Sequence, residues 1–118
     1  MPERRSLEVR EVGDVTMVRF RDKRITEDHK AQEVGRELYN LVEGGNGKNV
    51  LVSLSSVDFL SSAALGKLVT LDKKTRARGG VLKLSDICPK LSQIFAVTRL
   101  DRLFDIEPDE TAALAAFC

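Results

Sequence analysis

An almost unbroken apolar run near the middle of the chain constrains its fold more than any other feature. Residues 49–54 (NVLVSL) form this run, whose lack of polar alternation is typical of a strand covered on both faces. Apolar residues recur at helical spacing before the run, over residues 27–43, and after it, over residues 62–78. Helices and strands that alternate in this way form mainly parallel sheets, because each crossover helix packs back onto the sheet.

Elements on both sides of this centre extend the pattern. Residues 7–12 and 15–20 flank a Gly-Asp turn and predict an antiparallel hairpin, while residues 21–25 hold either one more short extended piece or a loop. The elements expected after residue 78 are a buried strand over 81–84, a short helix over 89–97, a strand over 103–106 and a terminal helix from Pro108. The fold class predicted is α/β, with a mixed, mainly parallel sheet, antiparallel pairing at the N-terminus and about four helices.

Composition and charge narrow the class of protein. The 118 residues are 42% hydrophobic and 31% charged, as in ordinary globular proteins, and no linker or repeat divides them. We therefore expect one domain over residues 1–118, with residues 1–6 as a disordered tail. A formal net charge of +1 demands neither nucleic acid nor an anionic membrane as partner. Without an apolar signal core or membrane-length run, a cytoplasmic location is expected.

Few residues could support catalysis or metal binding. His29 is the only histidine, and Cys88 and Cys118 have no neighbouring cysteine at metal-ligand spacing, so no metal, cofactor or disulfide is expected. Cys88 is expected to be a buried small apolar residue. The glycine-rich segment 44–48 lies between a helix and a strand, which is the wrong order for a phosphate-binding loop and favours a flexible turn. The basic end of the 62–78 helix is expected to be a solvated helix terminus.

Two hydroxyl residues stand where the 62–78 helix begins. Ser61 and Ser62 follow a short loop after the apolar strand, and serine is a preferred N-cap of helices. We expect Ser62 to take this position. The positive end of the helix dipole also stabilises added negative charge, so a phosphate on Ser62 would be compatible with the fold and would change the local surface. A plain cap remains the alternative, and the two roles are compatible. The pattern indicates a switchable binding module rather than an enzyme.

The order of these motifs resembles the STAS domain, a family that includes bacterial anti-sigma factor antagonists. One matching stretch runs from the apolar strand through residues 59–66 (FLSSAALG) and a helix to Gly79-Gly80 and the next strand. A second, residues 94–106, resembles the family's final helix, turn and strand, with its Leu-Asp-x-x-Phe run. The resemblance covers about residues 7–117 and implies a mixed sheet with helices on one side.

The resemblance also implies a function. Family members bind, when dephosphorylated, an anti-sigma factor that is also a serine kinase, and so free a sigma factor; phosphorylation blocks binding and a serine phosphatase reverses it. The phosphoacceptor corresponds to Ser62, with Ser61 as second choice. Where the family often has Asp before the acceptor, this chain has Ser61, and Thr26 stands near the place of another common Asp.

Partner contacts are expected at the carboxyl end of the parallel strands, where ligands of open α/β sheets bind. The expected contact residues are Thr26, Glu27, Asp28, Asp58, Phe59, Leu60, Ser61, Ser62 and Ala63. Phe59 either anchors its loop in the core or contacts a partner. A homodimer stays open. The alternative function is a STAS scaffold or self-assembling regulatory subunit whose serine is never phosphorylated.

Overall fold

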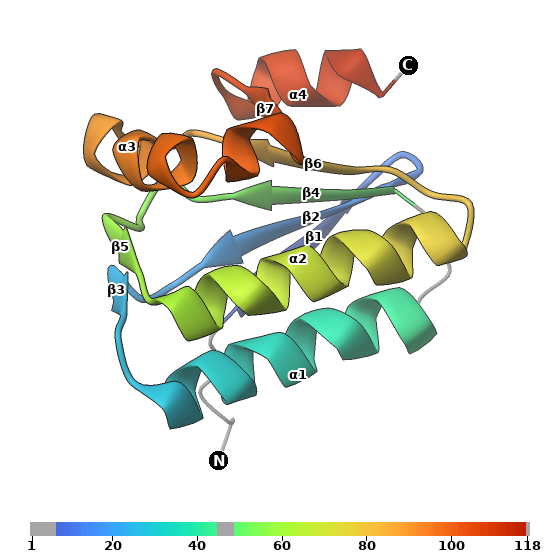
Figure 1. Ribbon diagram of the computed structural model, residues 1–118. Coiled ribbons are helices and arrows are strands. Elements are labelled where there is room, and N and C mark those ends of the chain that lie inside the picture. Colours follow the sequence, from blue (N-terminus) through green and yellow to red (C-terminus); the bar gives the residue numbers. More distant parts are fainter. Residues whose placement is uncertain (1–6, 45–48, 118) are drawn as a thin grey trace.

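A computed structural model of the chain describes residues 7–44 and 49–117. The expected tail over 1–6, most of the glycine-rich turn and Cys118 lie outside these ranges. The strands are β1 (Leu7–Val12), β2 (Val15–Phe20), β3 (Arg24–Ile25), β4 (Asn49–Ser53), β5 (Phe59–Leu60), β6 (Leu82–Ser85) and β7 (Asp105–Glu107). The helices are α1 (Asp28–Gly44), α2 (Ser62–Ala77), α3 (Pro89–Val97), the 3-10 helix η1 (Leu100–Arg102) and α4 (Glu110–Ala116) (Figure 1).

Five of the strands form the main sheet, in the order β1-β2-β4-β6-β7. β1 and β2 pair antiparallel across the predicted turn, and all other neighbours pair parallel. The apolar run becomes the central strand β4, in which Val50, Leu51 and Val52 are all at most 3% exposed. The predicted mixed, mainly parallel sheet is therefore confirmed, and its centre is covered on both faces.

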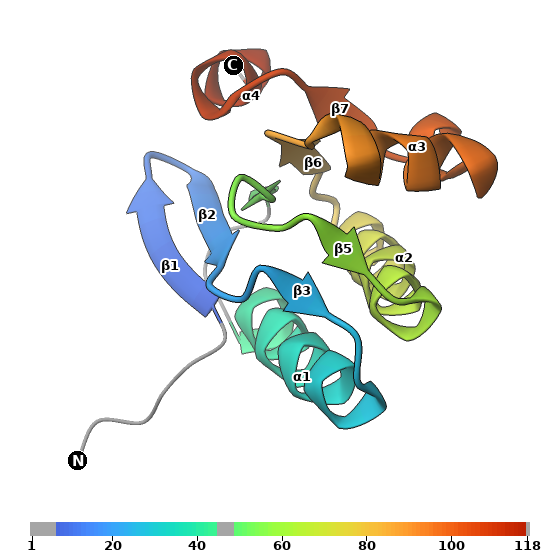
Figure 2. The same cartoon turned by 90° about the vertical axis from the view of Figure 1, so that its left-hand side faces the viewer.

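Helices cover both faces of this sheet, not one face as the family resemblance implied. Side chains of β4 alternate between faces, so Val50 and Val52 join the larger core under α1, α2 and α3. Leu51 points the other way, into a smaller cluster that includes Met17 and Ala113 of α4. Figure 2 shows α4 on the side of the sheet away from α1 and α2. The apolar second face of β4 explains why α4 packs there.

Two predicted boundaries need correction near the C-terminus. The last strand begins at Asp105 rather than Leu103, because Leu103 and Phe104 close the η1 turn with hydrogen bonds from their backbone N–H groups to the Leu100 carbonyl. Phe104 is then 4% exposed, with its ring centroid 6.0 Å from that of Phe95. The terminal helix begins at Glu110 rather than Pro108.

Residues 58–60, expected as loop, contain the short strand β5. It pairs in parallel with β3 to form a separate two-stranded sheet, so the polar segment before α1 does hold an extended piece. The two strands lie where α1 and α2 begin (Figure 2). Among the residues described, no helix is both long and apolar enough to cross a membrane.

Candidate functional site

The β3–β5 pair brings together the two segments that were expected to contact a partner. Ile25 pairs with Leu60, and the Ser61 N–H donates to the Ile25 carbonyl over 2.8 Å. One step earlier, the Asp58 N–H donates to the Lys23 carbonyl, also over 2.8 Å. The residues that follow each strand, Thr26 on one side and Ser61 on the other, therefore lie side by side. The two strands that lead to them end where α1 and α2 begin (Figure 2).

The sequence predicted that Ser62 is both the N-cap of α2 and the phosphoacceptor, but the structure gives the capping role to Ser61. Ser61, not Ser62, is the N-cap of α2: its backbone is extended (φ −70°, ψ 166°) and its Oγ accepts from the Ala64 N–H at 3.2 Å. Ser62 is instead the first residue of the helix and is exposed. Within the described parts of the chain, no hydrogen bond involves the Ser62 hydroxyl. This hydroxyl is therefore accessible and not needed for capping.

The other expected contact residues differ in their exposure. Thr26, Glu27 and Asp28 are exposed, and Asp58, Phe59 and Ala63 are partly exposed. Leu60 is the exception, because only 1% of it is exposed and its side chain packs in the larger core. Leu60 thus anchors β5 and has no surface to offer a partner, which corrects its expected contact role.

Arg24 is a residue of this end that the sequence did not single out. Its guanidinium carbon lies 5.2 Å from the centroid of the Phe59 ring, and its Nη1 lies 3.9 Å from Asp58 Oδ1. Phe59 stands opposite Arg24 in the parallel register of β3 and β5. Nothing in the sequence pattern could indicate this contact, because two-residue strands show no periodicity and the partners are far apart in the chain.

The local charges favour an added anion at α2. The first turn of this helix holds no acidic residue, while Lys74 and Arg76 lie in its last turn. The positive end of the helix dipole at Ser62 is therefore not already offset by a carboxylate of its own helix. Asp58 is the nearest acid in the preceding loop, and its Oδ1 is buried without a hydrogen-bond partner among the described residues.

Lys30 fixes the start of α1 near the same end. Its Nζ lies 2.8 Å from Asp22 Oδ2, in the segment between β2 and β3. The hydrogen bond to Asp22 raises the pKa of Lys30 above its usual value, so the lysine stays charged. The pair links the chain leading into β3 to the start of α1.

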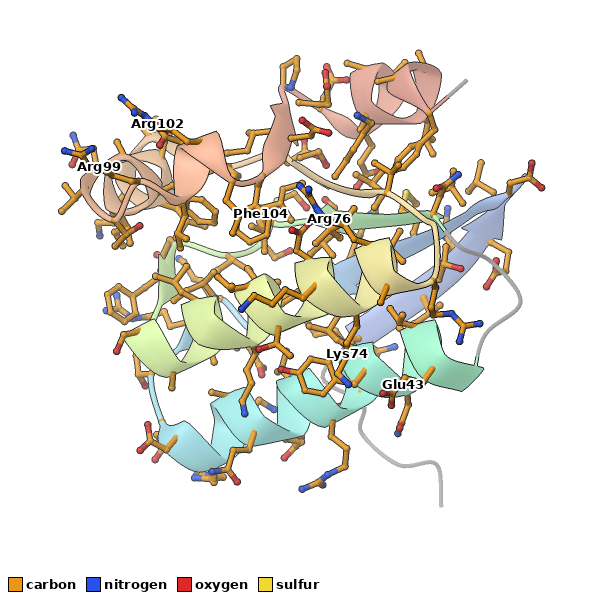
Figure 3. All side chains as sticks on the ribbon, turned by 45° about the vertical axis from the view of Figure 1, so that its right-hand side comes forward. Glu43, Lys74, Arg76, Arg99, Arg102 and Phe104 are labelled. Carbon is orange, nitrogen blue, oxygen red and sulfur yellow. The ribbon has the colours of Figure 1, made fainter. Side chains whose placement is uncertain are left out.

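The basic end of α2 forms polar contacts both with α1 and within α2. Lys74 Nζ lies 2.7 Å from Glu43 Oε2 at the end of α1 (Figure 3), and Arg76 Nε lies 3.0 Å from Asp72 Oδ2. Arg78 also reaches the Glu43 carbonyl, at 3.4 Å. These contacts are typical of a solvated helix end that complements the dipole.

Cys88 differs from its expected role. It is half-buried rather than buried, and it caps α3, where its Sγ accepts from the Leu91 N–H at 3.5 Å. His29 is exposed in the first turn of α1. In the described portion of the chain, no group of three or more His, Cys, Asp or Glu side chains could hold a metal ion.

The fold and this end of the domain agree with one family of known proteins. The family model of the STAS domain matches residues 6–113, and the chain belongs to the STAS domain family. Its curated relatives include the putative anti-sigma factor antagonist BtrV of Bordetella bronchiseptica, 29% identical over 87 residues, which are 74% of each chain. They also include the anti-sigma-B factor antagonist of Bacillus subtilis, 32% identical over 60 residues, which are 51% of this chain and 55% of that protein.

A solved structure shows the same fold. The anti-sigma-factor antagonist (STAS) domain protein from Planctomyces limnophilus superimposes with a TM-score of 0.87 over 98% of this chain and 100% of that one. The two sequences are 22% identical, so this likeness concerns the fold.

Proposed function

We propose that this protein is an anti-sigma factor antagonist whose binding surface is the end of the domain where α1 and α2 begin. In this proposal the partner is an anti-sigma factor that also acts as a serine kinase, and phosphorylation of Ser62 blocks their contact. The observation that carries the proposal is the exposed Ser62 hydroxyl at the first position of α2, beside a cap supplied by Ser61. The curated relatives named as anti-sigma factor antagonists support the partner class.

The modification is chemically simple. Ser62 Oγ forms a bond to the terminal phosphorus of a nucleoside triphosphate held by the kinase, the bond from that phosphorus to the bridging oxygen breaks, and the nucleoside diphosphate leaves. The hydroxyl proton is released. The product carries about −1.5 to −2 charge and three strong acceptor oxygens. A serine phosphatase restores the hydroxyl by hydrolysis.

The position of Ser62 predicts how the phosphate acts. Placed at a helix N-terminus whose first turn lacks acids, the dianion is stabilised by the backbone N–H groups and the dipole, so the fold stays intact. The same group occupies volume on the exposed surface beside Thr26 and Ser61, and it repels acidic groups of a docking partner. Binding is lost without unfolding.

A direct test compares the wild type with Ser62→Asp and Ser62→Ala in calorimetric titration with the anti-sigma factor. Ser62→Asp is expected to weaken binding at least tenfold, about 1.4 kcal/mol, with an unchanged far-UV circular dichroism spectrum. Ser62→Ala is expected to bind like the wild type and to take up no phosphate from the kinase. Ser92→Asp is the matched control, because it adds the same charge at an exposed serine of α3.

Two outcomes contradict the proposal or redirect it. Equal affinities of the wild type and Ser62→Asp would remove the switching mechanism. Phosphate on the Ser62→Ala variant would assign the modification to Ser61. Intact mass of the protein from its own cells, before and after phosphatase treatment, distinguishes a phosphorylated antagonist from an unmodified scaffold subunit.

A further inference from the structure

We propose that Arg24 is the internal phosphate-binding residue of the switch: when Ser62 is phosphorylated, it moves off Phe59 and binds the phosphate while it stays beside Asp58. This inference rests on the proposed function only in taking Ser62 as the modified residue. The ligand is a phosphate monoester on the same chain, and Arg24 is a positioning residue that changes what the domain presents to its partner.

The register of the small sheet places Arg24 opposite Phe59, which stands three residues before the acceptor Ser62. Ile25 and Leu60, which pair with one another, are 0% and 1% exposed and point into the core. Side chains alternate along strands, so Arg24 and Phe59, one residue earlier on each strand, point outward. The chain then passes through Ser61 directly into Ser62, the exposed first residue of α2.

The present contacts of Arg24 are weak enough to exchange. Its side chain is 54% exposed, and its distance of 3.9 Å from Asp58 Oδ1 is that of an ion pair without a hydrogen bond. A cation–π contact made by an exposed guanidinium contributes little. A phosphate dianion offers three oxygens and a larger charge to a guanidinium that can donate two parallel hydrogen bonds. The exchange therefore favours the phosphate.

Asp58 gives the exchange a second reason. A new dianion at Ser62 is close in sequence to this carboxylate, and one of its oxygens is buried without a hydrogen bond among the described residues. Like charges raise the free energy of the phosphorylated form unless a cation lies between them. Arg24 already faces Asp58 and is the cation placed to do this.

The movement uncovers the Phe59 ring. In the unphosphorylated protein the Arg24 guanidinium lies over this ring, 5.2 Å from its centroid. Phe59 is itself half-buried. Phosphorylation then changes the docking surface in two ways, because it adds charge at Ser62 and removes the cation from Phe59. A partner that recognises Arg24 packed on Phe59 therefore meets a surface that is changed at both Phe59 and Ser62.

The experiment uses the full chain with phosphoserine introduced at position 62 during synthesis, so it requires neither kinase nor partner. Phosphorus-31 NMR follows the phosphate through a pH titration, and an ordinary phosphoserine has its second pKa near about 6. Since Arg24 stabilises the dianion, Arg24→Gln is expected to raise the phosphate pKa by about half a pH unit relative to the wild type. Arg21→Gln, the removal of an exposed arginine from the same segment, is expected to leave it unchanged.

Two further measurements keep the test decisive. Arg24→Lys retains the charge, so its phosphate pKa is expected to lie between those of the wild type and Arg24→Gln. If Arg24→Gln does not fold, Arg24→Lys is compared with the wild type in its place. The Phe59 ring resonances are expected to shift on phosphorylation in the wild type and to stay in place in Arg24→Gln. Identical titrations of the wild type and both Arg24 variants would overturn the inference. Because no partner is present, this result is independent of whether Ser62→Asp weakens binding.

Discussion

Ser61 and Ser62 carry the same side chain but differ in backbone conformation, and this decides what each can do. The extended backbone of Ser61 turns its hydroxyl toward the orphan N–H groups of α2, whereas helical Ser62 leaves its hydroxyl in solvent. Asp and Ser are both strong N-caps. Ser61 in the place where the family often has Asp therefore preserves the start of α2.

The stability of the two serine variants should differ accordingly. Ser61→Ala is expected to lower the free energy of unfolding by about 1 kcal/mol, because the Ala64 N–H loses its acceptor. Ser61→Asp keeps an acceptor and is expected to stay within about 0.5 kcal/mol of the wild type, as is Ser62→Ala. Urea unfolding followed by circular dichroism measures all three. A larger loss for Ser62→Ala than for Ser61→Ala would show that the cap is misassigned.

At this scale the sequence predicts the place of the site but not its details. The strand, loop and helix patterns indicate a hydroxyl pair at a helix start, since each pattern spans several residues. Which serine caps the helix depends on one residue's backbone angles, and helix ends are uncertain by a residue or two. The packing of Arg24 on Phe59 depends on a pairing between distant segments, which no local pattern contains.

Between elements, the contact of α1 with α2 depends on a close approach at Gly35. A Cβ atom there would lie 2.8 Å from Cδ of Lys67, so the lysine stem occupies the space that the glycine leaves. Gly66 lies on α2, and apart from its own stretch of chain no described heavy atom lies within 4 Å of where its Cβ would be. Gly35 and Gly66 thus differ in surroundings while sharing a helical backbone.

Alanine substitution at Gly35 and Gly66 should separate the effect of helix propensity from that of crowding by Lys67. Gly66→Ala is expected to raise the free energy of unfolding by about 0.5–1 kcal/mol, because alanine is the better helix former and meets nothing. Gly35→Ala is expected to raise the free energy of unfolding by less, since the Lys67 side chain must move to make room for the new methyl group. Adding Lys67→Ala should restore the gain at Gly35 and leave the gain at Gly66 unchanged. Equal gains at both sites in urea unfolding would mean that the Lys67 stem moves freely.

The attachment of α4 relies on an ion pair as well as on apolar contact. Arg19 Nε and Nη2 donate to the two carboxylate oxygens of Glu110 over 2.8 and 2.7 Å. This hydrogen bonding lowers the pKa of Glu110 below its ordinary value and raises that of Arg19. α4 is seven residues long, too short to be a stable helix alone, so these contacts with the sheet hold it in place.

The pair gives the stability a defined dependence on pH. The pKa of Glu110 is lower in the folded chain than in the unfolded chain. The stabilisation that ionised Glu110 gives to the folded chain is therefore complete above the ordinary pKa of 4.5, and it is lost as the pH falls through the folded pKa. Glu110→Gln is expected to be less stable by about 1 kcal/mol at pH 7, the upper range for a partly exposed pair. Measured by urea unfolding, the difference in the free energy of unfolding between the wild type and Glu110→Gln should shrink below pH 4.5. Glu107→Gln is the control, and a gap that stays constant in acid would contradict this role of Glu110.

The elements that the sequence predicts well are those with long patterns. The hairpin, α1, β4, α2 and α3 follow from apolar spacing, and α3 is found at its expected bounds, Pro89–Val97. The strands β3 and β5 have two residues each, which leaves no period to detect. The face chosen by α4 depends on contacts between distant segments, with Leu51 and Arg19, so a family expectation of one-sided helices was wrong.

Over the whole molecule, two apolar clusters share one sheet. The larger lies under α1, α2 and α3 and the smaller under α4, with β4 supplying side chains to both. Unfolding either cluster exposes apolar residues of the same strand, so the described layers should unfold together. Small domains of fewer than about 150 residues usually behave in this way.

This cooperativity can be measured with the chain's own fluorophore. Tyr39 is the only tyrosine and there is no tryptophan, so tyrosine fluorescence reports on the α1–α2 layer, where Lys74 Nζ lies 5.2 Å from the ring centroid. Circular dichroism reports on all helices and strands. We expect the two urea transitions to have the same midpoint and slope. Separate midpoints would mean that the α1–α2 layer unfolds independently of the sheet.

The location of α4 has a practical consequence for studying the protein in solution. Its axis runs away from the end where α1 and α2 begin, on the opposite face of the sheet (Figure 1). A fluorescent dye could be attached at exposed Ala115 after Ala115→Cys, with serine in place of the native cysteines so that α3 keeps a capping side chain. The dye would tumble with the domain and leave the docking end unobstructed. Anisotropy of that dye would then record complex formation in real time.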